Sequence, residues 1–430
     1  MPTEFITLMV SVRSGKVKQE SPQGEISPSC PSGKKGVSWR QLRRFPAGNP
    51  QEVPMPPISL LIKPASGSCN MRCRYCFYTD EAENRAVASM GRMTPEAMRV
   101  IVDKALDWAD GDCTFAFQGG EPTLAGLDFF RGLTDYVSAH PNPKGIRVHY
   151  ALQTNGYALN EDWAQWFAQN QVLVGVSLDG PKEIHDRYRV DREGKGTFQR
   201  VMASIRLLER YGVPFNILTV VSAANARHGR QVYEFFRRQD FRYQQYIECL
   251  DPIGEVPGGH DYSLTPQRYA AFLKAIFDAW YLDMKAGRYV YNRYFENLMM
   301  ILSGQRPESC NLQGSCSPQW VIEADGSVYP CDFYALDQWR LGNILTDSFP
   351  EMEQKRQELG FIQWSRRLPE ECRACRYVML CRNGCRRNRE PVTADSTEKN
   401  YFCDAYREFL GYAAPRLMEV YQLLRRRAGL

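Results

Sequence analysis

The stretch Cys69-Asn-Met-Arg-Cys73-Arg-Tyr-Cys76 decides which fold and which chemistry to expect of this chain. It holds three cysteines with three and two residues between them, and it follows the apolar run 58–63. A four-iron cluster needs four ligands, so three thiolates leave one iron open to an exogenous ligand, and such a cluster can do chemistry as well as carry electrons. The alternative is a structural zinc loop, which usually joins two cysteine or histidine pairs into a closed set of four ligands.

The composition argues against several classes of partner. With 430 residues, 43% hydrophobic and 24% charged, the chain has the composition of a globular protein with one or two domains and an appended module. A net charge of +5 over this length is too mild to indicate nucleic-acid binding. No apolar segment approaches the length that spans a membrane. We therefore expect neither a nucleic acid nor a membrane as partner.

Cysteine usage points to a reducing compartment. Eleven of the fourteen cysteines fall in spaced clusters, and none of the five histidines lies within one, which disfavours mixed Cys/His zinc sites. The short apolar run 5–12 follows an acidic residue without a basic segment, so it does not read as a secretory start, and a disulfide framework is not expected. The cysteines predict a cytoplasmic protein with free thiols as metal ligands. Cys30, Cys113 and Cys249 are left without a role, and a buried structural thiol is the default for Cys113.

Apolar, β-branched runs alternate with helical patterns along the first 260 residues. Strands are expected at 58–64, 113–118, 147–153, 172–178, 214–221 and 243–250. Helices are expected near 94–109, 124–139, 160–170, 197–212 and 226–238. This alternation predicts an α/β fold with a parallel sheet that is curled or barrel-like.

The flanking regions differ in composition. Residues 1–54 are rich in Ser, Pro, Gly and Lys and predict a disordered N-terminal extension. Residues 261–309 are expected to form a helical bridge, and 310–403 form a cysteine-rich region. Residues 404–430 predict an amphipathic helix that is interrupted by Pro415.

Chemistry in parallel α/β folds gathers at the carboxyl ends of the strands. Four polar or glycine-rich segments follow predicted strands: Gln118–Pro122, Gln153–Gly156, Ser177–Gly180 and Cys249–Pro252. In Gly119-Gly120-Glu121-Pro122 the glycine amides can bind a carboxylate, and Glu121 can accept from an ammonium group. Taken alone this motif is weak, because an ordinary turn is more common.

The cysteine loop followed by Gly119-Gly-Glu-Pro122 resembles the radical S-adenosylmethionine (radical SAM) enzymes. The resemblance implies that the methionine moiety of the cofactor chelates the open iron and that one electron from the cluster yields a 5′-deoxyadenosyl radical. It also implies a partial (βα)6 barrel, similar to a TIM barrel, as the radical SAM core over residues 55–260.

A second constellation reads Cys310-x5-Cys316-x14-Cys331, Cys372-x2-Cys375-x5-Cys381-x3-Cys385 and Cys403, with Gly326 five residues before Cys331. The pattern is similar to the SPASM extension, and its eight cysteines suffice for two fully ligated clusters. A zinc site stays the alternative for 372–385 in isolation. By the family pattern, Cys310, Cys316, Cys331 and Cys385 would hold one 4Fe-4S cluster, and Cys372, Cys375, Cys381 and Cys403 the other. With Cys69, Cys73 and Cys76, three clusters are expected.

From Met55 to about residue 425 the chain resembles the anaerobic sulfatase-maturating enzymes. The matching stretches are 59–65, 115–124, 152–156, 329–334, 340–343 and 384–387. The resemblance implies oxidation of a cysteine or serine in a Cys/Ser-x-Pro-x-Arg segment of a sulfatase to Cα-formylglycine. It also implies a flavodoxin- or ferredoxin-type reductant, and we expect a monomer.

Carried over position by position, the cofactor contacts would fall at Tyr75, Gly120, Ser177, Arg189 and Leu250. The plain alternatives are core packing for Tyr75 and Leu250, a strand-end cap for Ser177 and a surface ion pair for Arg189.

Asp332 follows a cluster ligand directly, and the family pattern places its catalytic base there. The alternative for Asp332 is a hydrogen-bond acceptor that orients the loop. In the implied reaction a hydrogen atom is removed from Cβ of the target residue. Asp332 takes the proton of the target thiol or hydroxyl, and a second electron passes from the substrate radical to an auxiliary cluster. Two competing functions are a SPASM maturase that modifies a small peptide and a non-catalytic zinc or electron-transfer protein.

Overall fold

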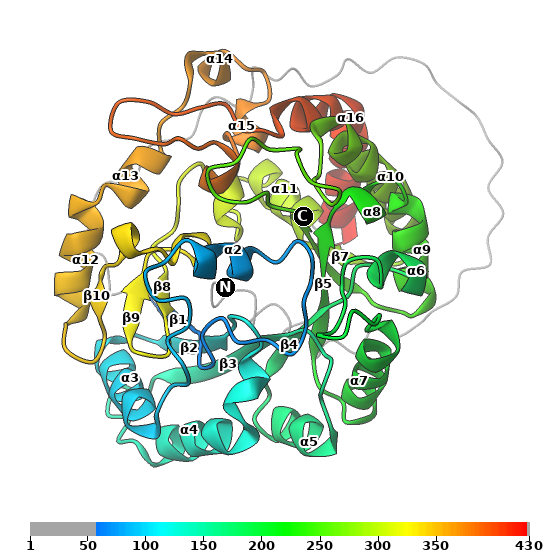
Figure 1. Cartoon of the computed structure of the whole chain (residues 1–430). Coiled ribbons are helices and arrows are strands. Elements are labelled where there is room, and N and C mark those ends of the chain that lie inside the picture. Colours follow the sequence, from blue (N-terminus) through cyan, green and yellow to red (C-terminus); the bar gives the residue numbers. More distant parts are fainter. Residues whose placement is uncertain (1–56, 428–430) are drawn as a thin grey trace, which may run out of the picture.

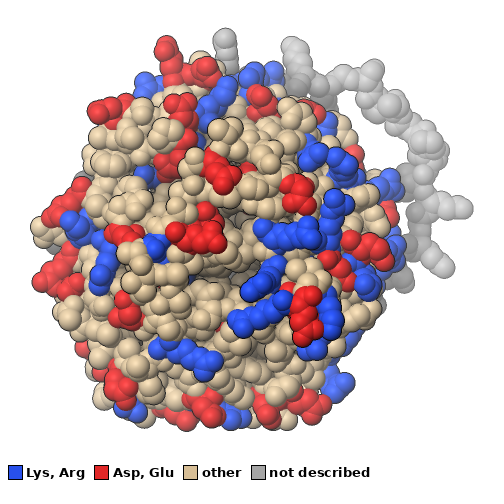
Figure 2. Space-filling model, in the orientation of Figure 1, with Lys and Arg blue, Asp and Glu red and all other residues tan. Residues whose placement is uncertain are grey.

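The computed structural model describes residues 57–427 (Figure 1). The disordered extension expected at 1–54 therefore lies outside the described residues, as does Cys30. No helix within 57–427 combines the length and the apolar composition needed to cross a membrane. Basic and acidic side chains are interspersed over the face shown in Figure 2, as the mild net charge predicts.

Six parallel strands form the core of the fold, and the predicted parallel sheet is confirmed. In order of chain and of pairing they are β1 (Ile58–Ile62), β2 (Asp112–Phe117), β3 (Arg147–Thr154), β4 (Leu173–Ser177), β5 (Phe215–Val221) and β6 (Tyr243–Glu248). Their ends lie within two residues of the expected ones, and several coincide with them. Leu60, Phe115, Val174 and Ile217 are wholly buried, which is typical of a parallel sheet covered on both faces.

Helices cover the outer face of this sheet (Figure 1). The expected ones are α3 (Pro95–Trp108), α4 (Leu127–Ala139), α5 (Glu161–Gln169), α7 (Phe198–Arg210) and α9 (Gly229–Arg238). The start of α3 follows its sequence signal, because the Thr94 hydroxyl accepts a hydrogen bond from the Ala97 amide and Pro95 opens the first turn. Three short helices were not expected: α2 (Phe77–Glu83), α6 (Lys182–His185) and α8 (Ala223–Ala226).

The cysteine-rich region continues the same sheet instead of folding apart from it. Strand β8 (Trp320–Ile322) pairs with β1 in parallel, and β9 (Ser327–Tyr329) and β10 (Gly342–Asn343) follow in antiparallel pairing. At the opposite edge, β7 (Tyr291–Asn292) pairs with β6. The strand order in the sheet is β10-β9-β8-β1-β2-β3-β4-β5-β6-β7. The described strands therefore form an open barrel with β10 and β7 as its edges. Because β8 lies beside β1, Asp332 is brought within 3.2 Å of Lys63, just after β1.

Small helices carry most of the remaining cysteine region. They are η3 (Cys310–Leu312), η4 (Asp332–Tyr334), η5 (Asp337–Trp339), α12 (Phe349–Glu358), α13 (Phe361–Ser365), α14 (Glu370–Arg373), α15 (Val378–Cys381) and η6 (Arg386–Asn388). Several cluster-type cysteines lie at or beside their ends.

The bridge and the C-terminus pack together as α10 (Pro266–Lys285), α11 (Arg293–Leu302) and α16 (Cys403–Arg427). The predicted interruption at Pro415 is wrong, because α16 runs through it without a break. Proline removes one backbone hydrogen bond inside a helix at a cost of about 3 kcal/mol. Burial of Ala413 and Leu417 on either side, in the packing against α10, offsets that cost.

Candidate active site

The first cysteine loop, Cys69–Cys76, is held by backbone contacts at the carboxyl ends of the strands. The Arg72 and Arg74 amides donate to carbonyls of the segment after α6, at 2.8 and 3.0 Å. The Asn155 side chain, just beyond β3, donates to the Asn70 side chain at 2.8 Å. Burial raises the pKa of Cys69 to about 11 and that of Cys73 to about 12, and the nearby Cys76 adds to both shifts. Such thiols become ligands when a cationic metal centre stabilises their thiolates, so the loop fits an iron–sulfur cluster.

The Gly119–Pro122 loop fixes the cysteine loop. The Gly120 amide donates to the Ser66 carbonyl at 2.9 Å, and the Glu121 amide donates to the Ser68 carbonyl at 2.7 Å. A Cβ on Gly120 would lie 2.2 Å from the Ser68 oxygen, so only glycine fits. Both carboxylate oxygens of Glu121 accept hydrogen bonds from residues at the end of β3. The Gly120 amide is therefore engaged by the chain itself. That the two glycine amides and Glu121 receive a ligand's carboxylate and ammonium groups stays a prediction.

Arg189 belongs to a buried group beside the cysteine loop. Its Nε lies 3.0 Å from Asp179 Oδ2, and the Tyr75 hydroxyl donates to the same oxygen. The guanidinium lies 5.5 Å from the centre of the Tyr75 ring. Arg189 is only 6% exposed, so the alternative of a surface ion pair is wrong. Burial dominates the raised pKa of Cys73, and the charge of the nearby Arg189 lowers it.

The other carried-over cofactor positions lie at neighbouring strand ends. Ser177 is the last residue of β4, and its hydroxyl accepts a hydrogen bond from the Gln153 side chain at 3.3 Å. Leu250 is half-buried, two residues after β6. All five positions thus lie at the carboxyl-end face of the sheet or in the segment after α6. That is where a cofactor bound to the cysteine loop would lie.

Asp332 is held by three elements that meet above the barrel. The Tyr78 hydroxyl, from α2, donates to Asp332 Oδ2 at 2.7 Å, and the Gln118 side chain, after β2, donates to the same oxygen at 2.8 Å. The Lys63 ammonium, after β1, lies 3.2 Å from Oδ1. Asp332 is 8% exposed, so these contacts fix the direction of a nearly buried carboxylate.

Behind Asp332 lies a buried network that sequence reasoning missed. Lys63 also lies 3.4 Å from Glu81 and 3.8 Å from Glu323, and Arg85 lies 2.7 Å from Glu323. Three carboxylates therefore share two cations, which leaves one negative charge uncompensated. Burial raises the pKa of Glu81 to about 7, with Lys63 opposing the shift. The charged partners are separated by 18 to more than 200 residues, and no local pattern marks them.

A cavity of about 1820 Å³ occupies the barrel interior. It extends from Ile58 and Asp112, at the amino ends of their strands, to Gln118 and Gln153 at the carboxyl ends, and it reaches Asp332. Pockets for small molecules usually measure 300–1,000 Å³. The cavity is thus large enough for a peptide segment.

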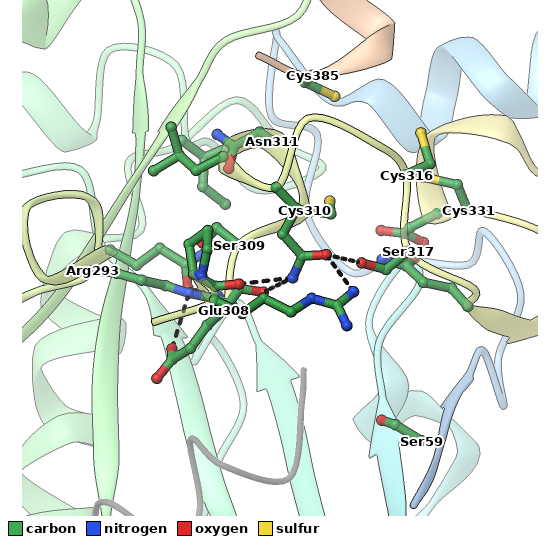
Figure 3. Close-up of a pocket in the computed structure, with 18 of the residues that line it drawn as sticks. Ser59, Arg293, Glu308, Ser309, Cys310, Asn311, Cys316, Ser317, Cys331 and Cys385 are labelled. Carbon is green, nitrogen blue, oxygen red and sulfur yellow. Dashed lines mark hydrogen bonds and ion pairs between the residues drawn. The ribbon is translucent and has the colours of Figure 1, made fainter. Parts of the chain in front are cut away.

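Four of the downstream cysteines face one shared space at the side of this cavity (Figure 3). They are Cys310, Cys316, Cys331 and Cys385. Burial raises the pKa of Cys331 well above its usual range, and the other three thiolates raise it further. The second group gathers in the same way around Cys381, whose pKa is raised to about 12 by burial and then by Cys403, Cys372 and Cys375. These are the two groups that the resemblance implies, and their ligation of clusters stays a prediction.

The cysteines of the described residues are not joined in disulfides. All thirteen cysteines within 57–427 are free thiols, and Cys113 is wholly buried, as expected. Over the same residues, no three Cys, His, Asp or Glu side chains come close enough together to hold a single metal ion.

Comparison with known proteins agrees with this geometry. Residues 64–236 match the radical SAM superfamily, and residues 314–376 match the SPASM iron–sulfur cluster-binding domain. The cysteine-type anaerobic sulfatase-maturating enzyme of Clostridium novyi (strain NT) is 48% identical over 355 residues, which is 83% of this chain and 95% of that protein. The chain belongs to the anaerobic sulfatase-maturating enzymes. It is therefore an enzyme, and the alternative of a non-catalytic zinc or electron-transfer protein is wrong.

Two further relatives place this sulfatase-maturating enzyme within its family. The serine-type anaerobic sulfatase-maturating enzyme of Bacteroides thetaiotaomicron is 29% identical, covering 84% of this chain and 90% of that protein. The solved structure of native anSMEcpe with bound AdoMet and Cp18Cys peptide superposes with a TM-score of 0.81 at 46% identity, covering 86% of this chain and 100% of that one. The expected fold is confirmed. The two domains imply S-adenosylmethionine and iron–sulfur clusters as cofactors.

Proposed function

We propose that this enzyme oxidises a cysteine or serine in a Cys/Ser-x-Pro-x-Arg segment of a sulfatase to Cα-formylglycine. The observation that carries the proposal is that Asp332 and four cluster-type cysteines line one cavity of peptide size. Membership of the sulfatase-maturating family supports the reaction.

Three 4Fe-4S clusters fit the cysteines. The open cluster would be held by Cys69, Cys73 and Cys76, and the two auxiliary clusters by Cys310, Cys316, Cys331 and Cys385 and by Cys372, Cys375, Cys381 and Cys403. S-adenosylmethionine would lie against Tyr75, Gly120, Ser177, Arg189 and Leu250. When bound to the open cluster it supplies the radical that removes a hydrogen atom from the target Cβ.

Asp332 would take the proton of the target thiol or hydroxyl. Tyr78, Gln118 and Lys63 hold its carboxylate in one orientation at the cavity wall. With Asp332, Glu81 and Glu323 all ionised, the buried network has one negative charge in excess, and uptake of one proton makes it neutral. General-base help of this kind is typically worth about 10²–10⁴-fold in rate.

We propose cysteine as the preferred target. The relatives at 47–48% identity are cysteine-type enzymes, whereas the serine-type relatives are 28–29% identical. We further propose a flavodoxin- or ferredoxin-type reductant, a monomer and a cytoplasmic location, where the free thiols described above stay reduced.

The test is an anaerobic incubation of the reconstituted, reduced full chain with S-adenosylmethionine and a peptide that contains Cys-x-Pro-x-Arg. We expect the aldehyde by mass spectrometry, together with 5′-deoxyadenosine, and a slower reaction with the serine peptide. A peptide with alanine at the target position is the control and should stay unmodified. Formation of 5′-deoxyadenosine with recovery of the unmodified cysteine peptide would contradict the proposal, and a crosslinked product would favour a peptide-modifying SPASM maturase instead.

A further inference from the structure

Arg389 is a buried cation without a carboxylate partner. The buried arginines within 57–427 are Arg85, Arg189, Arg356, Arg386 and Arg389. The first four each lie within salt-bridge distance of a carboxylate. Among the described residues none lies that close to Arg389, which is 2% exposed. Buried charges in proteins are nearly always paired, because an unpaired one costs several kcal/mol.

The hydrogen bonds of Arg389 are also incomplete. Its Nη1 donates to the Arg367 carbonyl at 3.1 Å, and its Nη2 donates to the Ser365 carbonyl. Its Nε is buried and has no hydrogen-bond partner within the described part of the chain. The protein thus leaves one full charge and one N–H donor uncompensated at this place.

The uncompensated group lies beside the cysteines on the cavity wall. Ser365 connects them directly, because its hydroxyl accepts from the Cys316 amide at 2.8 Å while its carbonyl accepts from Arg389. Arg389 follows Cys385 by the single turn of η6 and lines the same cavity. Burial lowers the pKa of Arg389, and the thiolates of Cys316 and Cys385 oppose that shift. Figure 3 shows that these two thiols face the space that an iron–sulfur cluster would fill.

We propose that Arg389 is the counter-ion of the cluster ligated by Cys310, Cys316, Cys331 and Cys385, and that it raises the reduction potential of that cluster. A four-iron cluster with four thiolates carries net negative charge, which reduction increases. A fixed positive charge and an N–H donor to sulfur both stabilise the reduced form, and both are known determinants of cluster potential. The inference rests on the cluster assignment in the proposed function. It makes this cluster a better acceptor for an electron from the substrate.

Arg386 does not have this role, although it lies next to Cys385. Its Nε lies 3.1 Å from Glu390, and its guanidinium packs 4.6 Å from the ring centres of Trp339 and Phe361. Its charge is therefore compensated by the protein itself.

The test is a redox titration of the reconstituted full chain, monitored by electron paramagnetic resonance without substrate. We expect Arg389→Met to shift the midpoint potential of one cluster by at least 59 mV to a more negative value. For one electron this corresponds to a tenfold change in the reduced-to-oxidised ratio. The other two clusters should keep their midpoints and serve as internal references. Arg389→Lys keeps the charge, so its midpoint should lie close to that of the wild type. Arg387→Met is the matched control, because it removes a cation of the same turn that lies 3.8 Å from Asp80 instead.

Unchanged midpoints in Arg389→Met, or equal shifts of all three clusters, would overturn the proposal. A second measurement needs no variant that loses charge. In wild-type chain labelled with ¹⁵N only in the guanidinium groups of arginine, pulsed resonance on the reduced protein should show a ¹⁵N coupling that Arg389→Lys abolishes. A coupling from Arg189, which lies beside the Cys69–Cys76 loop, should persist in that variant. Absence of that coupling in the wild type would also overturn the proposal. Neither readout involves a sulfatase, so a failure of the peptide assay and a failure here are distinguishable.

Discussion

Replacing Asp332 by asparagine keeps the size of the side chain but removes its charge and its capacity to take a proton. An asparagine can still accept from Tyr78 or Gln118 through its carbonyl oxygen, so the loop should keep its position. The lost contact is the 3.2 Å ion pair with Lys63, which retains Glu81 as a partner. The expected effect is therefore chemical, a loss of about 10²–10⁴-fold in aldehyde formation. That corresponds to about 3–5 kcal/mol in the activation barrier.

The assay should follow two products, because the variant separates two steps. Aldehyde is measured by mass spectrometry and 5′-deoxyadenosine by chromatography, both per reconstituted chain. Since Asp332 acts on the substrate proton, cofactor cleavage should persist, and the ratio of 5′-deoxyadenosine to aldehyde should rise by the same large factor. Asp337→Asn is the matched control, because Asp337 is an exposed acid on the same loop that only accepts from the Ala86 amide at 2.8 Å. Its rate should stay near that of the wild type.

The result that would refute this reasoning is aldehyde formation by Asp332→Asn within threefold of the wild-type rate. A loss of iron in the variant would refute it in another way, since Asp332 would then support the Cys331 loop and not the chemistry. Iron content before the assay separates these two results.

Two further predictions concern the supporting structure. Gly120→Ala should displace the cysteine loop, because its Cβ would lie 2.2 Å from the Ser68 oxygen, so the purified chain should lose about one cluster's share of iron. Gly132→Ala is the control and should bind iron normally, because Gly132 lies in α4 and its Cβ would only touch the Met98 side chain at 4.0 Å. Burial raises the pKa of Glu296 to about 7, so the folded state binds the proton of this carboxyl more tightly than the unfolded state does. The protonated carboxyl therefore contributes up to ~3 kcal/mol to the free energy of unfolding at low pH. That contribution should be lost as the pH rises from about 4.5 to 7. Glu296→Gln should flatten that dependence in thermal unfolding scans at pH 5 and pH 8, and an unchanged slope would contradict the assignment.

The periodic parts of the fold were predictable because each strand buries a continuous apolar run. Strands such as β4, with all five residues buried, leave the same pattern in the sequence that they show in the sheet. Helix α2 was missed because its seven residues, Phe77–Glu83, are too few to show a helical period. The break predicted at Pro415 was wrong because proline's local effect on a helix was overridden by the packing of α16 against α10.

The site was predictable where spacing carries the chemistry, as in the Cys69–Cys76 loop, whereas the grouping of the eight downstream cysteines followed from the family resemblance and not from their spacing. Its polar surroundings were not predictable, because they depend on which strand lies next to which. Lys63 meets Glu323 only because β8 pairs with β1, and nothing in either local sequence indicates that pairing. Gly120 is a related case. The contact between its amide and the Ser66 carbonyl joins two loops that are about 50 residues apart, and neither local sequence indicates it.

The backbone contacts of the cysteine loop have a consequence for how the enzyme survives air. In zinc fingers the metal folds the chain, so losing the metal means unfolding. Here the amides of Arg72, Arg74, Gly120 and Glu121 attach the loop to the barrel through peptide groups alone, and none of these bonds requires iron. The loop should keep its shape after oxygen has destroyed the cluster. We therefore expect damage by air to be reversible, because iron and sulfide can rebuild the cluster in a loop that has kept its shape.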